Sequence, residues 1–155
     1  MADNFTRGQV AEAAAGIGAY ATKTMTFAGG TTNDPGDFDG TGNPATLFMV
    51  TGTVLMKLFA TCGTTLQGAS ATIEVGTALS TVGLIPLTTA TNIAANEIWH
   101  DATPDASIEL SSVATEKIVR QNVIQTVRTA NITAGVLTYH CIWKPISNDG
   151  NVVAA

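Results

Sequence analysis

The sequence predicts an all-β protein, an antiparallel β-sandwich or a jelly-roll-like fold in a single domain. Three observations lead to this prediction. Threonine and other β-branched residues are abundant, and they gather in short runs that Gly and Asn interrupt. The clearest runs alternate apolar and polar side chains, which is the period of a strand with one buried face. Helix-forming stretches are short, since residues 9–15 make about two turns before Gly16.

The chain has 155 residues, which is enough to bury a core in one domain. Residues 1–16 precede the first convincing strand, so we expect an N-terminal arm there and the β-sandwich domain over residues 17–155. Phe5, Val10 and Ile17 are candidate apolar anchors for such an arm, because a segment that becomes ordered on docking needs contacts to offset its lost backbone entropy. A frayed terminus without a role is the alternative.

The first strands are expected in the first half of the chain. Residues 20–27 predict a strand near a sheet edge, because Lys23 interrupts their apolar pattern. Residues 48–62 keep one apolar face at their even positions over the whole segment. We therefore expect one long strand there, with a bend or bulge at Gly52.

Shorter elements are expected in the middle of the chain. Residues 71–75 predict a strand with Glu74 pointing outward, and residues 107–110 predict another with Glu109 outward. Between them, residues 92–96 are expected to form a single helical turn.

Two further strands are expected at residues 119–127 and 136–143. The connection between them, residues 129–135, is short enough for an antiparallel hairpin. Pro145 ends the last strand. The apolar faces expected to point into the core are Val119, Val123 and Val127 in the first strand, and Leu137, Tyr139, Cys141 and Trp143 in the second.

Charge is scarce in this chain. Only 12% of the residues are charged, against about 25% in an ordinary soluble domain. The net charge of -5 and the scattered basic residues predict no nucleic-acid binding, which needs clustered Lys and Arg. The longest apolar run, residues 47–56, is about half of the roughly 20 residues of a membrane helix, so no membrane span is predicted. So weakly charged a surface favours docking against copies of itself or another protein.

The most site-like loop is residues 33–43, rich in Asp, Asn, Gly and Pro. Asp37, Asp39 and Thr41 echo the start of a calcium loop, in which alternating oxygens converge on one cation. Phe48 stands where that loop needs a bidentate Glu. A plain loop is therefore favoured over a calcium site.

Residues 100–101 are a His-Asp pair and residues 140–141 a His-Cys pair. Two His and two Cys could supply four zinc ligands, but their spacing matches no ligand pattern, and adjacent strand residues point to opposite faces. Cys62 and Cys141 lie in strand-like runs, which favours buried free thiols. No phosphate loop, nucleophile elbow or H-E-x-x-H helix occurs. We predict no enzymatic activity, no cofactor and no metal.

Trp99 lies in the polar, loop-like setting of residues 96–100. Two interpretations are open: a core anchor, or an exposed residue at a protein interface or a sugar-stacking site, because Trp is enriched at the centres of contacts. Trp99 is therefore a candidate contact residue beside those of the arm.

Several segments resemble small β-rich virion proteins of tailed bacteriophages, in particular head decoration (capsid cement) proteins. The likeness covers roughly residues 50–155 and has no diagnostic catalytic or ligand motif. The segments that carry it are residues 71–78, residues 93–99, and residues 129–135 running into residues 139–146.

This resemblance implies a β-sandwich made in the bacterial cytoplasm and carried on the exterior of a virion. There it would bind the major capsid protein and stabilise the capsid, as a homotrimer. Three other classes stay open: a phage tail or fibre component, a carbohydrate-binding β-sandwich module, and a small jelly-roll enzyme.

Overall fold

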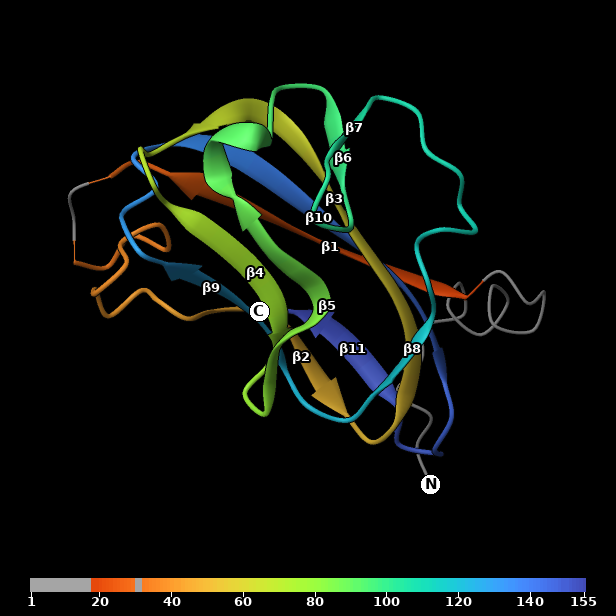
Figure 1. The fold of residues 1–155 in the computed structure, drawn as a ribbon. Coiled ribbons are helices and arrows are strands. Elements are labelled where there is room, and N and C mark those ends of the chain that lie inside the picture. The colour runs from red at the N-terminus through yellow and green to blue at the C-terminus, as the bar shows by residue number, and fades with distance from the viewer. Residues whose placement is uncertain (1–17, 30–31) are drawn as a thin grey trace.

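The computed structural model describes residues 18–29 and 32–155. Two antiparallel sheets pack against each other, as predicted (Figure 1). The first sheet contains, in spatial order, β1 (Ala19–Phe27), β10 (Ala134–Pro145), β3 (Val54–Gln67), β6 (Glu97–Trp99) and β7 (Asp105–Ala106), with β8 (Lys117–Val119) also paired to β3. The second contains β11 (Asn151–Ala154), β2 (Ala45–Thr51), β9 (Val123–Arg128), β4 (Thr72–Thr77) and β5 (Ser80–Thr89).

The strand pairs are nested along the chain. β1 pairs with β10, β2 with β9, β3 with β6, and β4 with β5, so each pair encloses the next. Successive strands of the first half alternate between the two sheets. This is the connectivity of a jelly roll, and the predicted fold class is confirmed.

The core lies between the sheets and follows the alternation seen in the sequence. Strand β10 alternates buried and half-buried residues along its length. Its inward face is the predicted one, and each of these side chains is at most 1% exposed: Leu137, Tyr139, Cys141 and Trp143. Strand β1 is an edge strand, again as predicted. Cys62 and Cys141 are buried free thiols.

The prediction of one long strand over residues 48–62 is wrong. β2 ends at Thr51 and β3 begins at Val54 in the other sheet. Gly52, with φ of 61°, allows the chain to turn there. Two residues, 52 and 53, connect β2 to β3. Because this number is even, the even-numbered positions face the core in both strands, and the alternation continues although the chain changes sheet.

The predicted strand over residues 119–127 is also two strands, β8 and β9, in different sheets. The valines expected on one face are nevertheless all buried. Residues 129–135 do not close a hairpin, because β9 lies in the second sheet and β10 in the first. Residues 107–110 form no strand; they belong to the connection between β7 and β8.

Glu74 was expected to point outward from β4, yet it is 2% exposed. Its Oε1 accepts a hydrogen bond from Arg128 Nε at 2.8 Å, on the neighbouring strand β9. This paired cation compensates the burial of the carboxylate.

A 3-10 turn, η1 (Ala90–Asn92), lies close to the turn predicted at residues 92–96. Residues 1–16 and the helix-forming stretch within them lie outside the described residues.

Candidate functional site

In the part of the chain that the structure describes, the sandwich has two edges, where the outer strands of its two sheets meet. At one edge, β1 lies beside β11, and Lys23 Nζ donates to the carbonyl of Ala155 just after β11. At the other, Lys117 Nζ of β8 donates to the carbonyls of Gly83 and Leu84 in β5, at 2.8 and 3.1 Å. We call these the β1/β11 edge and the β5/β8 edge, the latter comprising residues 77–89 and 97–119.

Exposed apolar side chains gather at the β5/β8 edge. Seven of the twelve large hydrophobic side chains that are exposed in the described part of the chain belong to it. The most exposed are Leu79 at 85% and Ile108 at 84%. Single exposed apolar residues are normal, but such a concentration is typical of an interaction surface. The seven are Leu79, Val82, Leu87, Ile108, Leu110, Val113 and Ile118.

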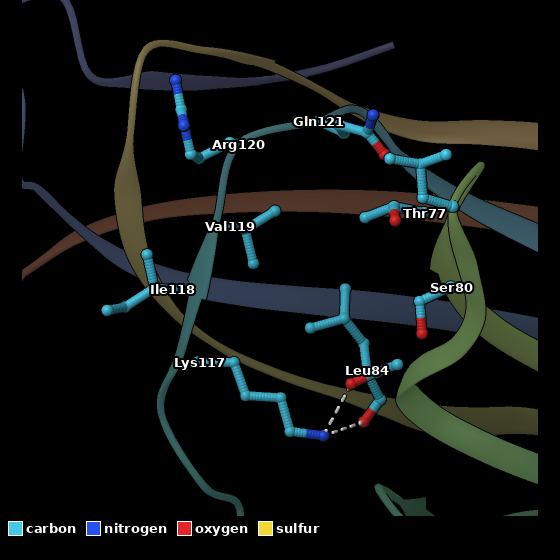
Figure 2. Close-up of a pocket in the computed structure, with 10 residues that line it drawn as sticks. Thr77, Ser80, Leu84, Lys117, Ile118, Val119, Arg120 and Gln121 are labelled. Carbon is cyan, nitrogen blue, oxygen red and sulfur yellow. Dashed lines mark hydrogen bonds between the residues drawn. The ribbon is translucent and has the colours of Figure 1, made fainter.

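A groove of about 660 Å³ lies at this edge, between β8 and the hairpin of β4 and β5. Figure 2 shows Leu84 and Val119 projecting into it from opposite sides, with Lys117 bonded to the backbone of β5 below them. Leu79 and Ile118 also line the groove, so it is continuous with the exposed apolar surface. The two hydrogen bonds of the Lys117 ammonium therefore connect β8 of the first sheet to β5 of the second.

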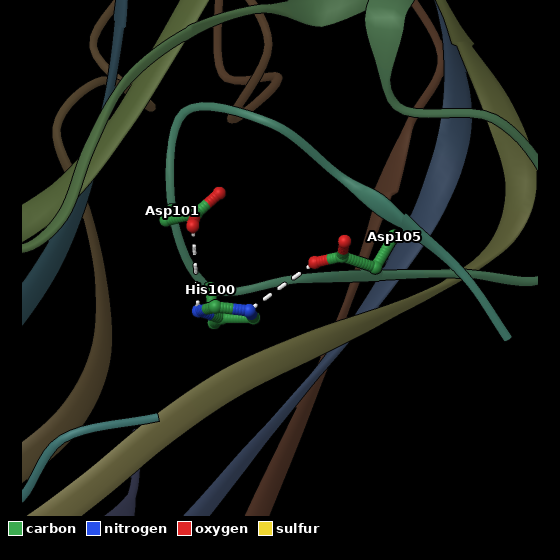
Figure 3. Close-up of side chains that lie close together, drawn as sticks. All are labelled: His100, Asp101 and Asp105. Carbon is green, nitrogen blue, oxygen red and sulfur yellow. Dashed lines mark ion pairs between the residues drawn. The ribbon is translucent and has the colours of Figure 1, made fainter. Parts of the chain in front are cut away.

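A histidine and several carboxylates lie close together at the same edge (Figure 3). His100 directly follows β6, and the pairing of β6 with β7 brings Asp105 back over it. His100 Nε2 lies 3.2 Å from Asp105 Oδ2 and 3.6 Å from Glu109 Oε2. Its Nδ1 lies 4.0 Å from Asp101 Oδ2. We call these four residues the His100 cluster.

The carboxyl groups of the His100 cluster are not equivalent. A hydrogen bond to Glu109, together with burial, raises the pKa of Asp105. The backbone N–H of Leu110 donates to Glu109 and lowers the pKa of that carboxyl.

Trp99 is not a surface residue, which corrects its assignment as a contact residue. It is 0% exposed, and its Nε1 donates to Thr88 Oγ1 of β5 at 2.9 Å. Its ring is tilted against that of Tyr139 in the core. Of the two interpretations, the structure supports the core anchor. Phe5, Val10 and Ile17 lie outside the described residues.

The two residues of the second histidine pair lie on opposite faces of the first sheet, His140 on the outer face and Cys141 in the core. His140 stacks on Phe59, with ring centroids 4.9 Å apart, and its Nε2 shares a hydrogen bond with Thr61 Oγ1. Burial lowers the pKa of His140 and raises that of the Cys141 thiol to about 12. Cys141 is therefore protonated at neutral pH, which disfavours it as a nucleophile.

Residues 33–43 form an ordered loop whose side chains bind its own backbone and that of β9. Asp34 accepts hydrogen bonds from the N–H groups of Ala28 and Gly36, both at 2.7 Å. Asn43 donates to the carbonyl of Val127 and accepts from its N–H. These contacts give Asp34 and Asn43 a structural role in the loop.

Within the described ranges, no helix has the length and apolar character that a membrane crossing requires. No protein family, no curated protein and no solved structure matches this chain.

Proposed function

We propose that the chain is a virion structural protein that binds the outside of a phage capsid, through its major capsid protein, and stabilises it. The observation that carries this proposal is the concentration of exposed apolar side chains at the β5/β8 edge. A standard interface covers about 800 Å² of each partner and has an apolar centre. Leu79, Val82 and Ile118, with the groove beside them, supply such a centre.

Two further features support the proposal. A surface with few charges loses little hydration when it docks, and only 12% of this chain is charged. The jelly roll recurs in viral capsid proteins, although it also occurs in lectin domains, so the fold supports the proposal by analogy. We propose the major capsid protein as the partner because the sequence resembles head decoration proteins.

The first test is co-sedimentation of the purified chain with undecorated phage capsids. Ile118→Asp places a charge at the β5/β8 edge and should weaken capsid binding about 30-fold, the equivalent of about 2 kcal/mol. Ile146→Asp is the matched control, because Ile146 is 54% exposed, like Ile118 at 68%, but lies just after β10, outside the β5/β8 edge. It should bind normally.

Failure of the unmodified chain to bind capsids would refute the decoration function itself. Equal loss in both Ile→Asp variants would refute the assignment of the β5/β8 edge. Binding to phage tails, seen by electron microscopy, or to sugars on a glycan array would instead favour a tail component or a carbohydrate-binding module.

We also propose that residues 1–16 form an arm that contacts a neighbour in the assembly, through Phe5, Val10 and the adjoining Ile17. Deleting residues 2–16 should weaken capsid co-sedimentation, and the unfolding temperature of the shortened chain is the check that it folds. Undiminished binding by the shortened chain would eliminate the arm as a contact.

A further inference from the structure

The His100 cluster has the geometry of a cation-binding site. In a tetrahedral zinc site with bonds of 2.0–2.2 Å, neighbouring ligand atoms are about 3.4 Å apart. The two carboxylate oxygens nearest His100 Nε2 lie at 3.2 and 3.6 Å, on either side of this value. Ligand atoms of His100, Asp101 and Asp105 all lie within 4.8 Å of one another.

A second observation also indicates a ligand. The side chain of His100 is 6% exposed, and its buried Nε2 makes no hydrogen bond of good geometry, although Asp105 Oδ2 lies 3.2 Å away. A buried ring nitrogen without a hydrogen bond is costly, so some other interaction is expected there. The nitrogen points into the group of carboxylates, where a shared cation would bind it.

We propose that His100 Nε2, Asp105 and Glu109 bind one divalent transition-metal cation of the Zn²⁺ class. Asp101 acts through His100: its Oδ1 accepts a hydrogen bond from Thr103 N at 2.7 Å, and its Oδ2 faces His100 Nδ1. A carboxylate beside the second ring nitrogen is the usual partner of a metal-binding histidine, because it fixes the orientation of the ring. Asp101 is therefore a positioning residue.

The choice of cation follows from the donor atoms. An imidazole nitrogen with two carboxylates suits zinc and similar transition metals, whereas Ca²⁺ and Mg²⁺ prefer oxygen ligands throughout. A cavity of about 190 Å³, lined by His100, Asp101 and Val113, leads to the site. Lys117 also lines this cavity, but its ammonium is bonded to the backbone of β5.

Such a cation would tie three segments together: the end of β6, strand β7 and the connection to β8. Glu109 lies between Ile108 and Leu110, which are 84% and 68% exposed. Binding of the metal through Glu109 therefore fixes the positions of two apolar side chains of the β5/β8 edge. The inference goes beyond capsid binding and does not depend on it.

The test uses the full chain after removal of metals with EDTA. Calorimetric titration with Zn²⁺ should show one ion bound per chain, and saturating Zn²⁺ should raise the unfolding temperature by about 5 °C. Ca²⁺ and Mg²⁺ should give neither effect. Zn²⁺ binding no tighter than about 1 mM, or equal binding of Ca²⁺, would overturn the proposal.

Conservative substitutions locate the ion. The double variant Asp105→Asn with Glu109→Gln should weaken Zn²⁺ binding more than about 100-fold, and Asp101→Asn about tenfold. Glu116→Gln is the matched control, because Glu116 lies in the same connection but pairs with Lys144. Unchanged affinity in the double variant would place the ion elsewhere.

A measurement on the unmodified chain decides the matter if that variant fails to fold. X-ray absorption at the zinc edge should show imidazole and oxygen ligands and no sulfur. Sulfur ligands would assign the ion to the cysteines and overturn the proposal.

Discussion

The β1/β11 edge and the β5/β8 edge close the same sandwich in different ways. β1 is a continuous strand of nine residues, and three of its polar side chains are hydrogen-bonded to neighbouring segments. Tyr20 bonds to His140, Thr24 bonds to Thr138 at 3.0 Å, and Lys23 bonds to the end of the chain. The β5/β8 edge consists of three strands of two or three residues beside β5, and its exposed side chains are largely apolar.

The difference shows how one fold protects one edge and leaves the other available. Long edge strands invite pairing with other chains, and polar or charged residues there reduce that tendency. The β1/β11 edge has such residues in Lys23 and a row of threonines. On its first-sheet side, the β5/β8 edge is divided into the short strands β6, β7 and β8, and an interaction there depends on apolar side chains and on the groove.

The largest expected effect concerns the core beneath each edge. Trp143 lies on β10 opposite Ala19 of β1, and Trp99 lies against β5; they are 1% and 0% exposed. Trp143→Ala and Trp99→Ala should each lower the free energy of unfolding by about 3–5 kcal/mol. Denaturant unfolding measures both. A melting curve unchanged by either substitution would show that the corresponding edge has no packed core beneath it.

The second prediction separates self-association from capsid binding. The chain should sediment as a homotrimer, three times its mass of 15.9 kDa. Because the β5/β8 edge is assigned to the capsid, Ile118→Asp should leave the trimer intact. Sedimentation equilibrium at micromolar concentration tests both statements. A monomer would contradict self-association, and a trimer dissociated by Ile118→Asp would assign this edge to the copies.

The third prediction concerns the sheet to which β5 belongs. Arg128 compensates the buried Glu74 and also lies 3.4 Å from Thr81 of β5. Arg128→Ala leaves the carboxylate without its cation and should cost about 1–3 kcal/mol, reduced because the arginine side chain is 48% exposed. Arg128→Lys should recover part of the loss. Equal stability of all three proteins would show that solvent compensates Glu74.

The smallest effect is a pH dependence at the β1/β11 edge. Burial lowers the pKa of His140 below its ordinary 6.5, so the unfolded chain takes up the proton first. This contribution to stability is present above pH 6.5 and is lost as the pH falls through the pKa of the folded state. When the pH is lowered from 7.5 to 5.5, the unfolding temperature of His140→Gln should therefore fall less than that of the unmodified protein. An equal loss would contradict the role of His140.

The sequence was sufficient to predict elements whose alternation is uninterrupted. β10 and β1 were predicted with the correct strand type, and the inward face of β10 was correct, because period-two patterns determine which face is buried. The same rule misled at Gly52, where the chain changes sheet without changing which positions face the core. Alternation identifies the buried face but not the sheet to which a strand belongs.

The two candidate functional features, the His100 cluster and the exposed apolar side chains of the β5/β8 edge, were harder to predict from the sequence. The sequence shows His100 and Asp101 as neighbours, but Asp105 joins them only through the pairing of β6 with β7. Glu109 joins them through the connection between β7 and β8, for which the sequence pattern predicts a strand. Glu74 was assigned outward because its partner Arg128 is 54 residues away. Contacts between distant segments depend on register, which local patterns do not provide. For the same reason, the sequence pattern does not predict that residues 107–113 lie at the surface.

The nested strand pairs have a consequence for synthesis of the chain. Tyr20 of β1 and its hydrogen-bond partner His140 of β10 are 120 residues apart. At roughly 5–20 residues per second, the ribosome needs roughly 6–24 s to make the partner strand after β1 has been made. During that interval β1 and β3 both lack β10, the strand that lies between them. Until β10 has been made, the nascent chain exposes unpaired strands. Chaperones that bind extended segments would protect such a chain from aggregation during this time.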